Sequence, residues 1–470
     1  MDTNKLPATA GKIVALPYQR EGVRDIEDFD GRALLADDMG LGKTMQALWF
    51  LKRKRVPTLP ALVVCPASVK YHWEHEAFTH VKMRGQVLEG RTPPKGKMQG
   101  VVPPLTIINP DILKQWLPYL RKMGIQTVIL DECQMFQNPA AGRTKAAMQL
   151  CRDVRNVVAL SGTPLTNRPA ELWPTLNMIR PDLFPSFFSY AQEYCQPRRA
   201  PWGWEYKGAE NIPQLHTLLR RNLMIRRLKK DVVKDLPDKV RAVVPMELSR
   251  PHEYRHASGD FLGWMKTNYG KIKARRAAKA AAVTRIGYLL RLAAKLKARA
   301  VVAWANKFVE EFPDEKLVLF AIHKKMIDVL SRRVNAKSVV VDGNVVKRRR
   351  KHAVDQFRQD PDTRIFIGNI KAAGTGVDGL QDVCSNLAFA EMWWRPGDHV
   401  QAEDRIHRIG QKGGAWISYL VAGGTIEEDL CRIIQAKQAI IRATLDGETI
   451  VEDDLDVWDQ LIQLITGNQN

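Results

Sequence analysis

Short apolar runs recur along the chain, and a loop of polar, Gly or Pro residues and then a helical pattern follow each of them. Apolar runs without polar alternation, separated by helices, are typical of parallel strands whose sheet is covered on both faces. The runs form two series and therefore predict two α/β lobes. The first series comprises residues 33–36, 61–65, 127–130 and 157–160, and the second comprises residues 317–320, 339–341, 365–368, 387–390 and 416–420.

The stretch between the two series has a different character. It begins rich in aromatic residues and proline and then becomes strongly basic, with 12 Lys or Arg residues and no Asp or Glu from Phe261 to Val309. Ile286, Leu289, Leu290, Ala293 and Leu296 recur within it at helical spacing and predict a helix with one apolar face.

Together these patterns predict five parts of the chain. They are a first α/β lobe at 1–183, a helical protrusion with the inter-lobe linker at 184–245, a basic helical insertion of the second lobe at 246–312, the second lobe at 313–445, and an acidic C-terminal helix at 446–470.

Composition narrows the class of protein. With 45% hydrophobic and 26% charged residues over 470 positions, the chain is neither disordered nor fibrous. Its six cysteines contain no Cys-x-x-Cys pair, so we expect buried thiols and neither a disulfide framework nor a zinc site. No apolar run reaches the 18 or so residues that span a bilayer, so we expect no membrane-spanning segment, and the motifs described below then leave no membrane partner.

Net charge points to a polyanionic partner. The chain carries +21 with a pI near 9.7, which favours nucleic acid first and an anionic membrane surface second. Seven acidic residues and no basic ones follow Arg442, so removing them from +21 leaves +28 on residues 1–442. The acidic tail either docks on the second lobe or competes with DNA as an autoinhibitory latch, and both readings stay open.

A phosphate-binding loop follows the first apolar run. Gly40, Gly42, Lys43 and Thr44 stand between a strand and a helix with Met45, Leu48 and Trp49 on one face, the setting that a nucleotide-binding loop requires. The glycines let backbone N–H groups turn toward phosphates, Lys43 reaches the β- and γ-phosphates, and the Thr44 hydroxyl ligates Mg²⁺. One departure is Asp37, which stands where the strict pattern has its first Gly.

Two adjacent carboxylates, Asp131 and Glu132, end another apolar run. The carboxyl ends of parallel strands are where α/β sheets bind ligands. Asp131 is expected to hold Mg²⁺ through water, and Glu132 to orient and deprotonate the attacking water. With the phosphate loop about 90 residues upstream, the pair predicts ATP hydrolysis.

These and other segments arrive in the order of the Swi/Snf family of superfamily-two DNA translocases, which the chain resembles from about Leu16 to Glu428. The resemblance implies two RecA-like lobes with helical insertions, DNA-dependent ATPase activity, the cofactors ATP and Mg²⁺, and double-stranded or branched DNA as the partner. It leans toward the annealing-helicase branch through residues 320–325 and 389–392. The segments that carry the resemblance are 16–23, 35–44, 64–68, 107–109, 160–167, 224–231, 372–376 and 401–411.

The family's functional residues carry over onto the matching positions. The nucleotide contacts that the resemblance implies are Gln19 for the adenine, then Asp38, Met39, Gly40, Leu41, Gly42, Lys43, Thr44 and, from the second lobe, Gly376. The residues that would couple hydrolysis to movement are Gln134, Ser161, Thr163 and Gln401. The implied DNA contacts are Ser68, Asn109, Arg226, Arg227, His323, Lys324 and Thr375.

Arg405 and Arg408 are the candidate arginine fingers. An arginine from a second body stabilises the charge that spreads over the phosphoryl oxygens in the transition state. Because the two are three residues apart, we expect them to project from one face of a helix. Two departures from the family are Gln134, where the superfamily often has His, and Val377-Asp378-Gly379, where Leu-Asn-Leu is usual.

Three functions stay open: an ATP-dependent double-stranded DNA translocase that remodels branched DNA or displaces bound proteins, a strand-separating helicase acting on DNA or RNA, and a non-catalytic scaffold. The intact Lys43, Glu132 and Arg408 disfavour the scaffold. Little chain precedes Gln19, so we expect a compact motor without accessory domains. We expect it in the cytoplasm, at the nucleoid, for a bacterial or viral source and in the nucleus for a eukaryotic one.

Overall fold

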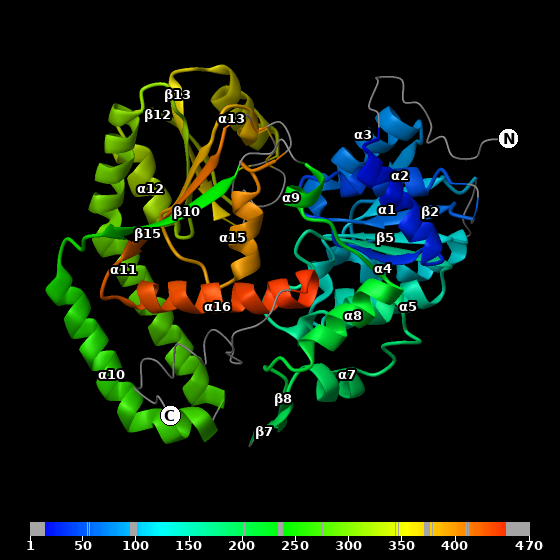
Figure 1. Ribbon diagram of the computed structural model, residues 1–470, viewed down its shortest axis with the longest axis horizontal. Coiled ribbons are helices and arrows are strands. Elements are labelled where there is room, and N and C mark those ends of the chain that lie inside the picture. Colours follow the sequence, from blue (N-terminus) through cyan, green and yellow to red (C-terminus); the bar gives the residue numbers. More distant parts are fainter. Residues whose placement is uncertain are drawn as a thin grey trace. The chain divides into compact units, whose positions relative to one another are not determined.

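The structure is a computed structural model that divides the chain into two compact units. It describes residues 15–447 except 54, 56, 95–100, 201–202, 234–237, 275, 344, 346, 371–376, 378, 409–410 and 412. The first unit, lobe 1, comprises Met1–Cys195, Ala209–Lys234 and Arg442–Glu448, and the second, lobe 2, comprises Gln196–Gly208, Asp235–Ile441 and Thr449–Asn470. Figure 1 labels the helices and strands of the two lobes.

Lobe 1 is built on a seven-stranded sheet in the order β3-β4-β2-β5-β6-β1-β9, and every neighbouring pair is parallel. The carboxyl ends of its strands therefore meet at one edge, where the ATPase motifs are expected. The strands are β1 (Arg32–Leu35), β2 (Ala61–Val64), β3 (Gly85–Val87), β4 (Leu105–Ile108), β5 (Thr127–Asp131), β6 (Asn156–Leu160) and β9 (Met224–Ile225).

Helices cover the sheet of lobe 1 because its strands are apolar on both faces. Alternate strand residues such as Leu35, Val63 and Ile129 pack in one buried cluster with apolar residues of α1, α2 and α3. On other strand surfaces α6 contacts β1 and β6, and α5 contacts α4 and α6. The helices are α1 (Pro17–Asp28), α2 (Lys43–Phe50), α3 (Lys70–Val81), α4 (Pro110–Leu120), α5 (Gly142–Arg152), α6 (Trp173–Ile179), α7 (Phe187–Tyr194), α8 (Ile212–Asn222) and α9 (Lys229–Val232).

Lobe 2 has a six-stranded sheet in the order β10-β15-β14-β11-β13-β12, again parallel at every pair. The five apolar runs of the second series are all strands of it. The strands are β10 (Lys239–Met246), β11 (Leu317–Ala321), β12 (Lys337–Val341), β13 (Thr363–Asn369), β14 (Asn386–Phe389) and β15 (Ala415–Ala422). A separate antiparallel pair joins β7 (Arg198–Ala200) and β8 (Gly203–Glu205).

Strand β10 was not expected, because the sequence assigns residues 239–245 to the inter-lobe linker. It is an edge strand whose side chains are mostly exposed, including Val240 and Val243, and it contains Pro245, which an edge strand tolerates. Such a strand lacks the continuous apolar run that marked the others. Residues 239–245 are therefore part of the sheet of lobe 2.

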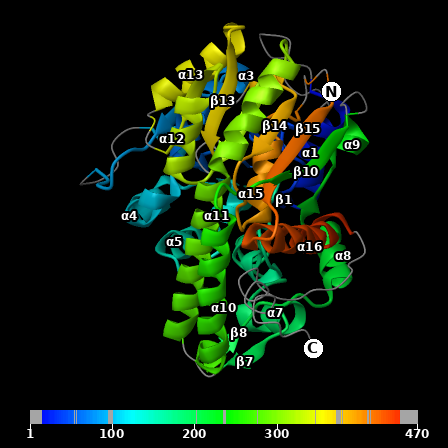
Figure 2. The same ribbon diagram turned by 90° about the vertical axis from the view of Figure 1, so that its left-hand side faces the viewer.

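The basic insertion consists of two long helices, α10 (Pro251–Ala274) and α11 (Arg276–Glu311), which lie side by side (Figure 2). Ile286, Leu289, Ala293 and Leu296 are buried in one apolar cluster, as their spacing predicts. The C-terminal half of α11 packs with α12 (Lys324–Arg333) on one face of the sheet. The other face carries α13 (Lys347–Gln359), α15 (Pro396–Glu403) and α16 (Ile426–Asp446).

One basic residue of the insertion faces the core. Lys297 is fully buried, and its ammonium donates to Glu427 at 2.7 Å and to the Leu420 carbonyl at 2.5 Å. Counting charges along the sequence cannot separate this lysine from its solvated neighbours.

All six cysteines are free thiols and five of them are buried, as expected. The described residues contain no cluster of His, Cys, Asp and Glu that would bind a metal ion by itself. None of the described helices combines the length and apolar character that crossing a membrane requires.

Candidate active site

The phosphate-binding loop lies between β1 and α2, as predicted. Gly40 and Gly42 have φ values of 86° and 74°, in the left-handed region that glycine adopts at little cost. Helix α2 begins at Lys43, so the loop directs the N-terminus of that helix toward the carboxyl edge of the sheet. This arrangement offers unpaired backbone N–H groups to an anion.

Lys43 lies inside this loop. Its ammonium donates to the carbonyl oxygens of Asp37 at 2.6 Å and Asp38 at 3.1 Å. Burial lowers the pKa of Lys43, while the negative charges of Asp37, Glu132 and Asp38 raise it. The amine is therefore held among acceptors that a triphosphate would replace.

Asp37, the departure from the strict loop pattern, holds the phosphate loop through hydrogen bonds of its buried carboxylate. It is fully buried, and its carboxylate accepts hydrogen bonds from Gln46 at 3.0 Å and Arg227 at 3.4 Å. Burial raises the pKa of Asp37, and Arg227 and Gln46 oppose that rise. A carboxylate at this position thus fixes the loop through side-chain bonds that the Gly of the strict pattern lacks.

Arg226 and Arg227, two of the expected DNA contacts, are paired with carboxylates around the phosphate loop. The Arg226 guanidinium pairs with Asp38 at 3.0 Å and with Asp446 at 2.7 Å, and donates to the carbonyls of Ala36 and Gly162. Arg227 pairs with Asp25 at 2.6 Å and reaches Asp37. Both cations are largely buried and paired with carboxylates of lobe 1, and these bonds support the phosphate loop.

The loop also meets helix α1, which holds the expected adenine contact. Gln19 is buried, and its amide donates to the Leu41 carbonyl at 3.2 Å while its oxygen accepts from the backbone of Leu16. Gln19 therefore touches the phosphate loop directly. Thr44, in the first turn of α2, is partly exposed at the same place.

The two carboxylates end β5, as predicted. Asp131 is the last residue of the strand, and Glu132 follows with a φ of 52°. The Asp131 carboxylate accepts from the indole N–H of Trp73 at 2.8 Å and from the backbone N–H of Glu132 at 3.1 Å. Burial, and then the charge of Glu132, raise the pKa of Asp131. Trp73 was missed because no motif marks it.

A hydrogen-bond relay runs from Glu132 to the segment after β6. The Gln134 amide donates to Glu132 at 2.6 Å, and its oxygen accepts from the Ser161 hydroxyl at 2.7 Å. The Ser161 oxygen in turn accepts from the backbone N–H of Thr163 at 3.0 Å. The three expected coupling residues of lobe 1 are therefore one connected chain, and Gln134 makes the link that a histidine often makes in the superfamily.

The expected DNA contacts of lobe 1 follow neighbouring strands. Ser68 lies in η1 (Ala67–Val69) after β2 and is partly exposed, and Asn109 follows β4 and is 8% exposed. Because β2 and β4 are parallel neighbours, both residues belong to the carboxyl edge of the sheet.

Lobe 2 holds the arginine candidates in a turn and not in a helix. Helix α15 ends at Glu403, and the residues after it form successive turns, so the prediction of a helical face for Arg405 and Arg408 is wrong. Arg405 is 7% exposed and donates to the Val377 carbonyl at 3.1 Å. Arg408 is partly exposed. The two arginines therefore differ in what they can reach.

A buried carboxylate next to that turn ties it to the start of lobe 2. Glu403 is fully buried and bonds to Lys239 at 3.0 Å, to Arg241 at 2.7 Å and to the Tyr419 hydroxyl at 2.6 Å. Burial alone raises the pKa of Glu403, but Lys239 and Arg241 outweigh it and lower the pKa to about 2. Sequence reasoning missed these partners because Lys239 and Arg241 were assigned to the linker.

Removing this charge should destabilise lobe 2. We expect Glu403→Gln to lower its free energy of unfolding by roughly 3 kcal/mol, because Arg241 loses its counter-charge while Lys239 keeps Asp404 at 3.3 Å. A carboxyl with a lowered folded-state pKa stabilises above its ordinary pKa and loses that effect as pH falls, here between the ordinary value of 4.5 and about 2. Urea unfolding at neutral and acidic pH measures both, and the exposed Glu311→Gln is the matched control. Equal stability of the two variants would contradict the assignment.

His323 and Lys324, the other expected DNA contacts, start helix α12. The buried carboxylate of Glu391 accepts from the His323 ring at 2.5 Å and from the backbone N–H groups of Ile322 and His323. Lys324 is exposed. Gln401 lies in α15 and is partly exposed. Thr375 and Gly376 lie outside the described residues.

Two cavities of lobe 2 lie at opposite ends of its strands. One of about 690 Å³, the basic groove, is lined by Arg291 and Lys295 of α11 and Lys324 and Lys325 of α12. His323 and Glu391 also line it, and they follow the carboxyl ends of β11 and β14.

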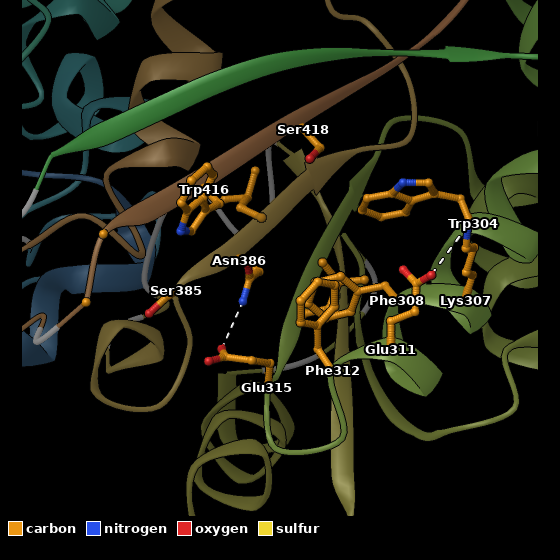
Figure 3. A pocket seen from close by; sticks show the side chains of 14 residues that line it. Trp304, Lys307, Phe308, Glu311, Phe312, Glu315, Ser385, Asn386, Trp416 and Ser418 are labelled. Carbon is orange, nitrogen blue, oxygen red and sulfur yellow. Dashed lines mark hydrogen bonds and ion pairs between the residues drawn. The ribbon is translucent and has the colours of Figure 1, made fainter.

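The other cavity, of about 670 Å³, is aromatic (Figure 3). Trp304 and Phe308 of α11, with Phe312 directly after it, line this cavity together with Trp416, and the strands contribute residues from their amino-terminal ends. Because parallel sheets bind ligands at the carboxyl ends of their strands, this cavity is not the nucleotide site.

Comparison with known proteins agrees with the motifs. The model of the SNF2-related domain matches residues 18–298, and that of the helicase conserved C-terminal domain matches residues 300–410. A solved structure described as the Sulfolobus solfataricus SWI2/SNF2 ATPase core in complex with dsDNA is 21% identical, covers 97% of this chain and 96% of that chain, and has a TM-score of 0.45.

Curated relatives are more similar in sequence. The SWI/SNF-related matrix-associated actin-dependent regulator of chromatin subfamily A-like protein 1 homolog of Caenorhabditis elegans is 34% identical over 92% of this chain and 62% of its own length. The corresponding Xenopus tropicalis protein is 33% identical over 91% of this chain and 44% of its own. DNA annealing helicase and endonuclease ZRANB3 of Mus musculus is 32% identical over 94% of this chain and 42% of its own.

The chain thus spans between two fifths and two thirds of the length of these relatives. The match to an annealing helicase confirms the lean toward that branch. Since the SNF2-related domain alone matches more than half of the chain, the chain belongs to the Swi/Snf family of superfamily-two ATPases.

Proposed function

We propose that this chain is a DNA-dependent ATPase that uses ATP hydrolysis to translocate along double-stranded DNA. The observation that carries the proposal is the relay from Glu132 through Gln134 to Ser161, which starts at the expected catalytic carboxylate. A relay of short hydrogen bonds lets the occupancy of the nucleotide site change the position of a distant segment. A simple nucleotide-binding protein has no need of it.

In the proposed reaction each residue of lobe 1 has one task. Lys43 binds the β- and γ-phosphates after leaving its present carbonyl partners, and the N–H groups of residues 40–44 surround the same oxygens. Glu132 accepts a proton from the attacking water, and its bond to Gln134 fixes the carboxylate orientation. Gln19 lies against the loop, where it would contact the adenine.

The site also suits Mg²⁺. Carboxylate and hydroxyl oxygens are its usual protein ligands, and it is commonly held by one or two of these together with phosphates and waters. Asp131, at the end of β5, and Thr44, in the first turn of α2, are the residues that would hold it. When bound, it neutralises charge on the phosphate oxygens.

The DNA track is inferred from charge and position. The basic groove presents four cations, although Lys295 shares its charge with Glu253 at 3.6 Å. The groove lies at the carboxyl edge of the sheet of lobe 2, and Ser68 and Asn109 lie at the carboxyl edge of the sheet of lobe 1. Phosphate contacts of this kind are independent of sequence, as a moving enzyme requires. We infer that the protein binds duplex DNA and that it is found in the nucleus of a eukaryotic host or at the nucleoid of a bacterial one.

The relatives narrow the outcome of translocation. One is named a DNA annealing helicase and others are named regulators of chromatin, so remodelling of branched DNA or displacement of bound proteins is the work that we propose. Annealing pairs the bases of two complementary strands. A translocase that moves along the duplex favours this pairing because it drives the separated strands back together.

The test is ATP turnover with different nucleic acids. We expect blunt duplex and forked DNA to stimulate turnover, RNA and single strands to stimulate it less, and Lys43→Ala to abolish it because the phosphates lose their cation. The exposed lysine at position 52 supplies the matched control, Lys52→Ala, which should leave turnover unchanged. Strand release from a tailed duplex would favour a strand-separating helicase, and turnover independent of all nucleic acids would refute the proposal.

A further inference from the structure

Trp73 is a buried residue that the ATPase motifs do not include. It lies in the first turn of α3, is 1% exposed, and packs among apolar residues of β2 and β5 such as Val63 and Ile129. Its indole N–H nevertheless donates to the Asp131 carboxylate at 2.8 Å. The indole ring therefore packs in the apolar core, while its N–H group is hydrogen-bonded to an expected catalytic residue.

This bond is not a general consequence of burying tryptophan. Trp49, on α2, is equally buried and belongs to the same apolar cluster, but its indole N–H has no hydrogen-bond partner among the described residues. The Asp131 carboxylate, in contrast, has one oxygen bonded to Trp73 and the other to the backbone N–H of Glu132. Together the two donors fix how the carboxylate is turned.

Trp73 is also joined to the expected DNA contact by continuous structure. The short helix η1, which contains Ser68, ends at Val69, and α3 begins at the next residue. Val69 packs against the same cluster as Trp73, and the Lys70 ammonium donates to the Leu88 carbonyl at 2.9 Å. The segment between Ser68 and Trp73 is therefore held by packing at Val69 and by a hydrogen bond at Lys70.

We propose that Trp73 is a positioning residue that links DNA contact at Ser68 to the carboxylate of Asp131 and so to binding of the Mg²⁺–nucleotide complex. The inference rests on the proposed function, because Ser68 must touch DNA and Asp131 must hold the metal. Residues that orient a metal ligand from behind affect metal affinity strongly, by about 10–100-fold in known cases. By linkage, DNA and the Mg²⁺–nucleotide complex then change each other's affinity by the same factor.

The experiment compares Trp73→Phe with Trp49→Phe. Both variants lose an indole, but only the first loses a hydrogen bond to a carboxylate. Binding of a fluorescent non-hydrolysable ATP analogue is titrated with Mg²⁺, with and without blunt duplex DNA. We expect Trp73→Phe to need about 10-fold more Mg²⁺ and to lose most of the effect of DNA on nucleotide affinity, while Trp49→Phe behaves as the wild type.

Three outcomes decide the matter. Equal Mg²⁺ dependence and equal DNA effect in the two variants would overturn the inference, while wild-type protein whose nucleotide binding ignores DNA would instead refute the proposed function. Melting temperatures report any difference in packing. If Trp73→Phe melts well below Trp49→Phe, Trp73→His is measured in its place: a ring N–H restores part of the DNA effect if the donor matters, and a loss as complete as that of Phe overturns the inference.

Discussion

Glu132→Gln should lower ATP turnover by about 10²–10⁴-fold while leaving nucleotide and duplex affinity close to the wild-type values. In the structure the Gln134 amide donates to a Glu132 oxygen, and the glutamine oxygen of the variant can accept the same hydrogen bond. The relay to Ser161 is therefore retained, and only the ability to accept a proton from water is lost. Single-turnover hydrolysis and equilibrium binding of the ATP analogue measure the two effects separately.

The matched variant for that experiment is Gln134→Ala. It keeps the Glu132 carboxylate but breaks both of the glutamine's bonds, to Glu132 and to Ser161. We expect it to hydrolyse ATP with weaker stimulation by duplex DNA. If Glu132→Gln turned over at the wild-type rate, Glu132 would not be the base, and the proposed mechanism would fail.

The parts of the molecule that the sequence predicts well are those with a local signal. Apolar runs located nine strands of the two sheets, because a central parallel strand is buried on both faces and must be apolar throughout. The phosphate loop and the Asp131–Glu132 pair also carry a local signal, because their chemistry requires particular residue types at a fixed spacing.

What the sequence could not show is which partner a charged side chain meets. Lys297 and Lys295 are two residues apart in one basic helix, yet the first is buried against Glu427 and the second lines the basic groove. Arg226 is likewise paired with Asp446, which lies 220 positions later in the sequence. Contacts this distant depend on the tertiary fold and leave no mark in spacing.

The arginine turn shows a third limit. Residues 398–408 contain no proline or glycine that would end a helix at Glu403, so the sequence favoured continuation. The Glu403 carboxylate, however, is bonded to Lys239, Arg241 and Tyr419, and the chain turns directly after it. Tertiary bonds to one buried residue thus override local helix propensity.

That turn leads to the last expected result, which separates two arginines that the sequence treats alike. Arg408→Ala should lower DNA-stimulated turnover by about 10³-fold or more, the usual effect of losing an arginine that stabilises the transferring phosphoryl group, with little change in melting temperature. Arg405→Ala should lower the melting temperature of lobe 2, because Arg405 is buried and bonded to the Val377 carbonyl. Arg408→Lys should recover little activity, since a lysine cannot form two parallel bonds to phosphate oxygens. The exposed Arg432 provides a control, Arg432→Ala, that should change neither quantity. If instead Arg408→Ala kept wild-type turnover and Arg405→Ala lost it without loss of stability, Arg405 would be the finger, and burial in lobe 2 alone would be a poor guide to catalytic role.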